Sequence, residues 1–200
     1  MAIVAKSKSE ISKERILIGA RELILTRGYS AMTVDAICAL AGITKGGFFH
    51  HFPSKDKLGE AALAMFWSEA KAREDSAEFK LANNPKQYLE QYLEYAIDAY
   101  QDPELQKGCM LAIYTMELQE SNEQLFTAAS KYFSEWRNGL YKMFEDAAQH
   151  SGKTLDIQAW VDLFISTLEG ALLVAKSNRD PAIINRSLKL FKRLIMQTLS

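Results

Sequence analysis

Residues 30–53 read SAMTVDAICALAGITKGGFFHHFP, and this stretch decides the fold of the N-terminal part of the chain. Thr33 and Thr44 each precede a short segment rich in small and apolar residues, where a threonine side chain caps the start of a helix. Gly42 lies between the two segments and favours a tight turn. The pattern predicts two short helices, over 34–40 and 45–51, joined by a turn. This is the plan of a helix-turn-helix, whose second helix enters the major groove of DNA.

The second predicted helix is unusual because two glycines, Gly46 and Gly47, follow Lys45. Each glycine disfavours a helix by about 1 kcal/mol relative to alanine. Because the sequence tolerates this cost, we expect the helix backbone to lie close to another surface. A DNA backbone or base edge is one such surface. Ile37 and Phe52 are expected to belong to the small core that holds the two helices together.

Helical periodicity extends over the rest of the chain. Before the quoted stretch, apolar residues recur on one helix face at Ile16, Ala20, Leu23 and Ile24. Gly28 then marks a helix end. Beyond the stretch, the spacing predicts helices over 55–81, 86–100, 109–119, 122–149, 155–176 and 181–199. No run of alternating β-branched residues predicts a strand. We therefore expect an all-α fold, with an N-terminal helix-turn-helix domain of three helices and a C-terminal helical bundle.

Composition and charge narrow the class of protein. Of 200 residues, 48% are hydrophobic and 24% are charged, as in ordinary globular proteins. Two cysteines cannot build a disulfide framework, and the chain has no evident signal peptide or membrane-spanning stretch, so we expect a cytoplasmic protein without a membrane partner. The first 60 residues carry nine Lys/Arg and six Asp/Glu, against 15 and 19 in the rest. This basic front end is a weak sign of a polyanionic partner, and sampling variation explains it at least as well.

Residues 11–67 resemble the DNA-binding domain of the tetracycline-repressor (TetR) family. The resemblance rests on Gly28-Tyr29, Thr33, Ile37, the run from Ala41 to Gly46, Phe49-His50-His51-Phe52, and Ser54-Lys55-Asp56-Lys57-Leu58. Two positions depart from the family pattern. Phe49 stands where the family has tyrosine, which removes a hydroxyl that would donate a hydrogen bond to a phosphate. Gly47 stands where a larger residue is frequent, which leaves less side-chain readout of the bases.

The resemblance implies which residues contact DNA. Thr33 offers its hydroxyl and backbone amide to a phosphate, and Lys45 reaches a guanine edge or a phosphate. His50 and Lys55 are expected to contact phosphates, which set register and affinity without reading sequence. The predicted DNA-binding residues are Thr33, Thr44, Lys45, Gly46, Gly47, Phe49, His50 and Lys55. Outside this context the threonines are helix caps only, and the lysines are solvated surface charges.

The resemblance also divides the chain into a DNA-binding domain over residues 10–70, with the helix-turn-helix at 33–52, and an effector-binding and dimerisation domain over 71–200. It implies that the last two helices pair with those of a second copy in a four-helix bundle. The predicted interface residues are Trp160, Phe164, Leu168, Leu188, Phe191 and Ile195. A homodimer would present two recognition helices one DNA turn apart, about 34–36 Å, or a multiple of it, to a pseudo-palindromic operator. Alternatively, both apolar stripes face the core of their own chain.

The C-terminal residues carry no catalytic motif, metal-ligand spacing or phosphate-binding loop, so we expect neither an enzyme nor a bound metal or cofactor. Aromatic and methionine residues are frequent there, and the resemblance implies an internal cavity for a small apolar or aromatic effector. Cys109 follows Gly108 at the start of a predicted helix, a position that lowers the pKa of a thiol. Cys109 is therefore a candidate redox sensor, and the alternative is a small core residue.

Together these observations predict a dimeric, ligand-responsive transcriptional regulator, a repressor released from its operator by a small-molecule effector. Two other functions stay open. One is an activator or an architectural DNA-binding protein without an effector. The other is a small-molecule binding module or an enzyme that has reused the N-terminal part.

Overall fold

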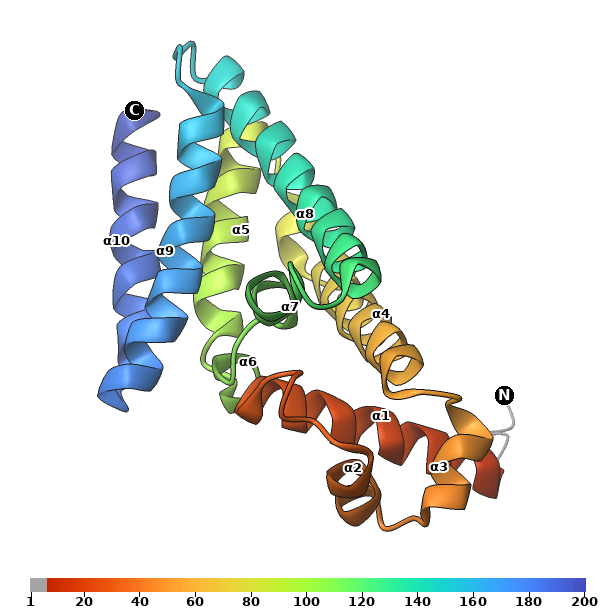
Figure 1. Cartoon of the computed structure of the whole chain (residues 1–200). Coiled ribbons are helices and arrows are strands. Elements are labelled where there is room, and N and C mark those ends of the chain that lie inside the picture. The colour runs from red at the N-terminus through yellow and green to blue at the C-terminus, as the bar shows by residue number, and fades with distance from the viewer. Residues whose placement is uncertain (1–6) are drawn as a thin grey trace. The chain divides into compact units, whose positions relative to one another are not determined.

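The computed structural model describes residues 7–200, and all regular elements in this range are helices (Figure 1). The all-α prediction is thereby confirmed. In chain order the helices are α1 (Lys8–Arg27), α2 (Val34–Ala41), α3 (Lys45–His51), α4 (Lys55–Asp75), α5 (Pro85–Ala99), α6 (Pro103–Gln106), α7 (Met110–Leu118), α8 (Glu123–His150), α9 (Ile157–Asn178) and α10 (Ala182–Thr198). A short 3₁₀ helix, η1 (Glu78–Leu81), follows α4.

Contacts between residues divide the chain into two compact units. The helix-turn-helix unit comprises the described part of residues 1–70 together with Met110–Tyr132. The bundle unit comprises Lys71–Cys109 together with Phe133–Ser200. The first unit thus has a boundary after Ala70, where the sequence predicts a domain boundary, but it also includes α7 and the start of α8. The division into a DNA-binding and an effector-binding domain stays a prediction, because compactness does not test function.

Side-chain caps set the helix boundaries in the helix-turn-helix unit. Thr33 and Thr44 begin α2 and α3 as predicted, and each hydroxyl accepts from the backbone N–H three residues further on, at 3.1 Å. Gly42 ends α2 in the left-handed region, at a φ of 65°, which a side chain would disfavour. α1 begins earlier than the apolar periodicity predicts, because Ser7 and Glu10 form a reciprocal capping box.

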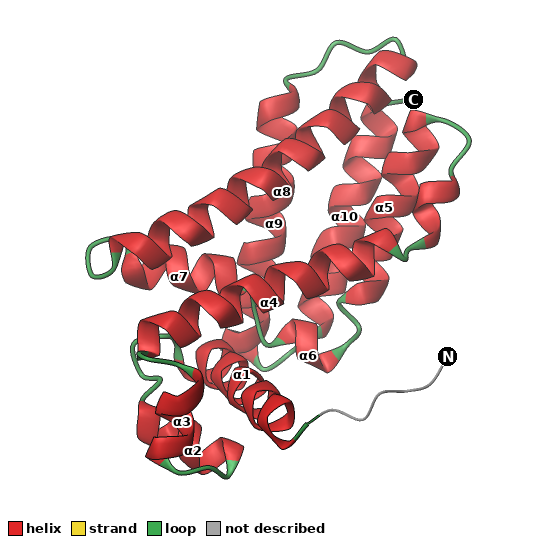
Figure 2. Ribbon diagram, turned by 90° about the vertical axis from the view of Figure 1, so that its right-hand side faces the viewer, coloured by secondary structure: helices red, strands yellow, loops and turns green. Residues whose placement is uncertain are grey.

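Apolar side chains from α1 to α4 form the core of the helix-turn-helix unit. The predicted face of α1 is buried at Ile16, Ala20, Leu23 and Ile24. Ile37 of α2 and Phe52 after α3 are buried as well, as predicted, and Phe48 of α3 is fully buried. α2 and α3 lie side by side in this unit, joined by the short loop that begins at Gly42 (Figure 2).

Helix boundaries in the bundle unit differ from the predicted ones at two places. The helix predicted over 55–81 ends at Asp75. Ser76 Oγ donates to the carbonyl of Arg73 there, and the backbone turns into η1. The chain between α5 and α7 forms α6, which periodicity does not predict because it has only four residues; Asp102 caps it. The last two predicted helices, over 155–176 and 181–199, are present as α9 and α10.

The predicted apolar stripes of α9 and α10 face the core of the bundle unit. Five of the six predicted dimer residues are at most 4% exposed and pack within the unit: Phe164, Leu168, Leu188, Phe191 and Ile195. The sixth, Trp160, is half-buried, and its ring lies 5.9 Å from that of Phe191. Their predicted place in a dimer interface is therefore corrected, since they fill the core of their own chain. Periodicity reveals an apolar face but not what covers it.

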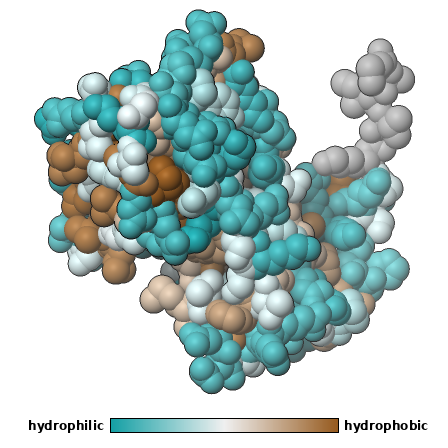
Figure 3. All heavy atoms as spheres, turned by 90° about the horizontal axis from the view of Figure 1, so that it is seen from above, coloured by the Kyte–Doolittle hydropathy of each residue, from teal (hydrophilic) through white to brown (hydrophobic). Residues whose placement is uncertain are grey.

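A second apolar set on the same two helices is exposed. Leu163, Leu173 and Val174 of α9 and Leu190 and Leu194 of α10 have relative exposures of 45–68%. Apolar side chains accordingly gather on one side of the bundle unit in Figure 3. α9 is also long and apolar enough to span a membrane by length and composition alone. This is weak evidence for a membrane span, because the core helix of a soluble protein meets the same two criteria.

Candidate nucleic-acid interface

α3 has one buried and one exposed face. Phe48 anchors the helix in the core, and its ring centroid lies 6.3 Å from that of Phe52. The predicted DNA-contacting positions of this segment are all exposed or partly exposed: Thr33, Thr44, Lys45, Gly46, Gly47, Phe49 and His50. They lie at the start of α2 and along α3, two helices that are in contact.

Lys45 joins the starts of α2 and α3 through an ion pair. Its Nζ lies 2.8 Å from Asp35 Oδ1, and both side chains are largely exposed. The hydrogen bond to Asp35 raises the pKa of Lys45, so the ammonium stays charged. An exposed pair of this kind is weak, and the ammonium can exchange Asp35 for a phosphate or a base edge. Asp35 also places a negative charge beside the predicted recognition residue.

Gly46 and Gly47 have no role that the chain itself requires. Both lie in the first turn of α3, and neither has a positive φ. A Cβ added at Gly46 would meet only Thr44 Oγ1, at 3.8 Å, and one at Gly47 would meet Thr44 Oγ1 at 3.5 Å and Ile43 Cβ at 3.8 Å. These are ordinary contacts, so alanine would fit at both positions and would favour the helix. We infer that the glycines are needed because another molecule approaches the backbone of α3 closely.

Aromatic side chains cover the rest of the exposed face of α3. Phe49 is 53% exposed and packs edge-on against Phe48, with ring centroids 5.1 Å apart. The rings of His50 and His51 lie 5.0 Å apart, and His50 is the more exposed of the two. Phe49 has no hydroxyl to offer a phosphate, but its exposed ring suits an apolar contact with a thymine methyl group.

Lys55 differs from the other predicted contact residues because its ammonium is engaged within the unit. Nζ lies 4.4 Å from the centroid of the Tyr29 ring and donates to the carbonyl of Ser30 at 3.3 Å. Desolvation lowers the pKa of Lys55. The half-buried side chain therefore braces the connection between α1 and α2. Its contact with a phosphate stays a prediction.

Two residues of α7 that the sequence did not predict also hold the connection between α1 and α2. Glu117 accepts a hydrogen bond from Ser30 N at 2.9 Å, and Tyr114 donates to the carbonyl of Gly59 in α4 at 3.1 Å. The Tyr114 ring packs edge-on against Tyr29, with centroids 5.2 Å apart. Burial raises the pKa of both tyrosines, so both stay neutral. These hydrogen bonds join residues 87 and 55 positions apart, so no local pattern signals them.

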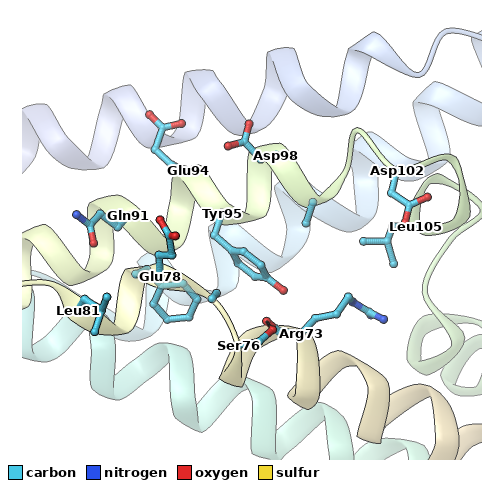
Figure 4. Close-up of a pocket in the computed structure, with 13 residues that line it drawn as sticks. Arg73, Ser76, Glu78, Leu81, Gln91, Glu94, Tyr95, Asp98, Asp102 and Leu105 are labelled. Carbon is cyan, nitrogen blue, oxygen red and sulfur yellow. Dashed lines mark hydrogen bonds between the residues drawn. The ribbon is translucent and has the colours of Figure 1, made fainter.

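The bundle unit contains an open groove and a half-buried thiol. The groove, of about 890 Å³, runs between the end of α4, η1 and α5, where Arg73 and Tyr95 point toward each other and Glu78 and Asp98 add negative charge (Figure 4). Cys109 lies immediately before α7, and its thiol hydrogen-bonds to a carboxylate of α9. Between residues 7 and 200 no group of His, Cys, Asp and Glu is arranged to hold a metal ion.

Two protein-family models match the chain. Residues 16–62 match "Bacterial regulatory proteins, tetR family", and residues 85–189 match "Transcriptional regulator LmrA/YxaF-like, C-terminal domain". Both matched families are transcriptional regulators rather than enzymes.

Individual proteins are similar over most of the chain. The HTH-type transcriptional repressor DhaR of Mycobacterium sp. (strain GP1) is 25% identical over 173 residues, which cover 84% of this chain and 85% of that protein. The transcriptional regulator AcuR of Cereibacter sphaeroides is 22% identical over 188 residues, with 92% and 85% covered. A solved TetR-family regulator from Agrobacterium tumefaciens has a TM-score of 0.81 at 24% identity and covers 93% of this chain and 98% of its own, which shows a common fold.

Proposed function

Because the chain belongs to the TetR family of bacterial regulatory proteins, we propose that it is a homodimeric repressor that leaves a pseudo-palindromic operator when a small molecule binds. Members of this family are DNA-binding transcriptional regulators, typically ligand-responsive repressors, and this chain is such a regulator. Beyond this, we propose that the operator is pseudo-palindromic, that a small-molecule effector releases the protein, and that the regulation is repression. The observation that carries the proposal is the exposed face of α3, where two glycines that the fold does not require follow Lys45.

In the proposed complex, α3 enters the major groove with its first turn foremost. Lys45 leaves Asp35 for a guanine edge or a phosphate, and the glycine pair lets the backbone approach the base edges. Thr33, Thr44 and His50 contact phosphates, which fix the register of the protein on the duplex. Phe49 contributes apolar contact where a tyrosine hydroxyl would reach a phosphate.

The exposed apolar set of α9 and α10 supports the dimer. These five large side chains stay in water in a single chain, and packing against the same set of a second copy would bury them. Gly170 lies on this side of α9, two turns from Leu163 and one turn from Leu173 and Val174. A Cβ at Gly170 would meet nothing within 4 Å in its own chain, so the glycine leaves room for a second helix. A two-fold pair of this kind suits a pseudo-palindromic operator.

Release by an effector requires two conformations with different affinities for the operator. An effector that binds more tightly to the conformation unable to match the operator shifts the population away from DNA. We expect α4 to transmit the change, since it begins at Lys55 in the helix-turn-helix unit and ends at Asp75 in the bundle unit.

Selection of duplexes from a random pool by the purified protein tests the proposal. The expected product is one pseudo-palindromic motif, bound by a dimer with an affinity that falls as salt rises. Lys45→Ala should weaken binding, whereas Lys153→Ala, in the exposed turn after α8, should leave it unchanged. The absence of an enriched motif, or equal binding by Lys45→Ala, would contradict the proposal. A reporter gene behind the selected site then distinguishes repression from activation.

Cys109 is a candidate sensor of a different signal. It would respond to an oxidant or electrophile, which would act in place of a ligand. The observation that favours it is its position immediately before α7, whose Tyr114 and Glu117 brace the helix-turn-helix unit. Operator binding by wild-type protein and by Cys109→Ser is compared after exposure to a mild oxidant. Loss of binding by wild type alone supports the sensor, and an equal response of both removes it.

A further inference from the structure

Asp35 places a carboxylate among the residues predicted to contact DNA. It lies in the first turn of α2, two residues after Thr33, and its side chain is 71% exposed. Its Oδ1 atom lies 2.8 Å from Nζ of Lys45, the first residue of α3. A negative charge here repels the phosphates of a duplex, whose attraction to cations supplies most of the affinity of non-specific binding. Asp35 therefore lowers the general affinity for DNA.

The fold gives only a small reason for this carboxylate. An acidic residue in the first turn interacts favourably with the helix dipole, but Thr33 already caps α2, since its hydroxyl accepts from Ala36 N at 3.1 Å. The ion pair with Lys45 joins two exposed side chains, and pairs of this kind contribute little to stability. A residue that lowers general affinity and adds little stability is expected to serve discrimination between sequences.

The ion pair matches the edge of one base pair in the major groove. Guanine presents the acceptors N7 and O6 there, and the cytosine paired with it presents the N4 amino group, a donor. O6 and N4 are hydrogen-bonded to each other at about 2.9 Å, close to the 2.8 Å that separates Lys45 Nζ from Asp35 Oδ1. An ammonium only donates and a carboxylate only accepts, so the two groups suit O6 and N4 respectively.

The other three base pairs fit the same two groups less well. With Lys45 over the purine, an A·T pair turns the adenine amino group toward the ammonium and thymine O4 toward the carboxylate, so both contacts repel. A C·G pair, with Lys45 over the cytosine, repels in the same way. A T·A pair offers O4 and N6 in the right order, but the thymine methyl group lies on the ammonium side and adenine N7, an acceptor, on the carboxylate side.

We propose that Asp35 is a specificity-determining residue, which together with Lys45 selects a G·C pair in each half of the operator. Lys45 turns from Asp35 to guanine, and the carboxylate that it releases accepts from cytosine N4 of the same pair. The carboxylate also rejects a base that presents an acceptor to it. This inference rests on the proposed function, which supplies the operator.

Selection from a random pool by wild-type protein, Asp35→Ala and Lys45→Ala in parallel locates the base pair. Wild-type protein should enrich a G·C pair in each half-site, and both variants should relax the preference at that pair. Fluorescence anisotropy then measures the loss of affinity when the pair is replaced by A·T. This loss should be at least about tenfold larger for wild type than for Asp35→Ala. The comparison is one of ratios, because removal of a negative charge also raises the affinity for every duplex.

A modified base tests the contact at a single hydrogen atom. N4-methylcytosine keeps its pair with guanine, but its methyl group replaces the amino hydrogen that faces the major groove. Wild-type protein should bind the operator modified at this cytosine at least about tenfold less tightly. Asp35→Ala has no carboxylate to accept the hydrogen, so it should bind both operators equally. The result with wild-type protein decides the inference even if Asp35→Ala does not fold.

Glu123→Ala is the matched control for the loss of a negative charge. Glu123 is an exposed acidic residue in the first turn of α8, within the same unit, so its replacement removes a charge and a helix-dipole interaction of the same kind. This variant should keep the wild-type preference at every position. Thermal melting shows whether each variant folds.

Any of three results would overturn the inference: a wild-type motif without a G·C pair that depends on Lys45, an Asp35→Ala motif as selective as that of the wild type, or unchanged binding of wild type to the N4-methylcytosine operator. The proposed function stands in all three cases, since an operator has been selected. It fails when wild-type protein enriches no motif, and the inference then fails with it.

Discussion

Replacement of Gly46 by alanine should stabilise the protein and weaken its binding to DNA. Gly46 lies in the first turn of α3 without a positive φ, and the added Cβ would meet only Thr44 Oγ1, at 3.8 Å. Alanine therefore fits, and it should stabilise the fold by about 0.5–1 kcal/mol through its helix propensity and the lower entropy of the unfolded chain. For a chain of this length that corresponds to a rise in Tm of about 1–4 °C.

Affinity for the operator should move in the opposite direction. The added methyl group stands on the exposed face of α3, where we expect the backbone to approach the base edges, so we predict a loss of at least about tenfold, the cost of one poorly accommodated contact. Fluorescence anisotropy with a selected duplex measures the affinity, and circular dichroism measures the melting temperature.

Gly139→Ala is the matched control. Gly139 lies within α8, where a Cβ would meet nothing within 4 Å, so alanine should raise the Tm by a similar amount and leave DNA binding unchanged. If Gly46→Ala stabilises the protein and still binds the operator as tightly as the wild type, the argument from the glycines is refuted.

Three further substitutions test other parts of the account. Asp35→Asn removes the negative charge 2.8 Å from the Lys45 ammonium and should tighten DNA binding at low salt, as measured by anisotropy; weaker binding would mean that the ion pair positions Lys45 for DNA. Tyr114→Phe removes the hydrogen bond to the Gly59 carbonyl from a buried side chain and should cost about 1 kcal/mol in chemical denaturation, and an unchanged midpoint would rule out a bracing role. Leu173→Glu places a charge in the exposed apolar set of α9 and should yield a folded monomer in sedimentation, whereas an intact dimer would exclude this face as the interface.

Local chemistry made the helix-turn-helix predictable from sequence. Thr33, Thr44 and Gly42 act through hydrogen bonds and backbone angles that involve residues at most four positions away, so their roles can be read from spacing alone. The same holds for the buried face of α1. The contacts of Lys55 with Tyr29 and of Glu117 with Ser30 could not be predicted in this way, because they join segments that only the tertiary fold brings together.

The apolar helices at the C-terminus show a different limit of sequence reasoning. Phe164 and Leu168 have the spacing of a buried face, and that spacing is the same whether the chain's own core or a partner covers it. The structure assigns them to the core and leaves Leu163 and Leu173 exposed on the same helix. Only the packing of α9 against its neighbours separates the two sets.

Methylation interference on a selected operator measures whether α3 lies in the major groove of DNA. Methyl groups at guanine N7 project into the major groove, whereas those at adenine N3 project into the minor groove. We expect guanine methylation to block binding in two symmetric half-sites whose centres lie one helical turn apart or a multiple of it. Binding that tolerates guanine methylation throughout the site, or is blocked only by adenine N3 methylation, would contradict it.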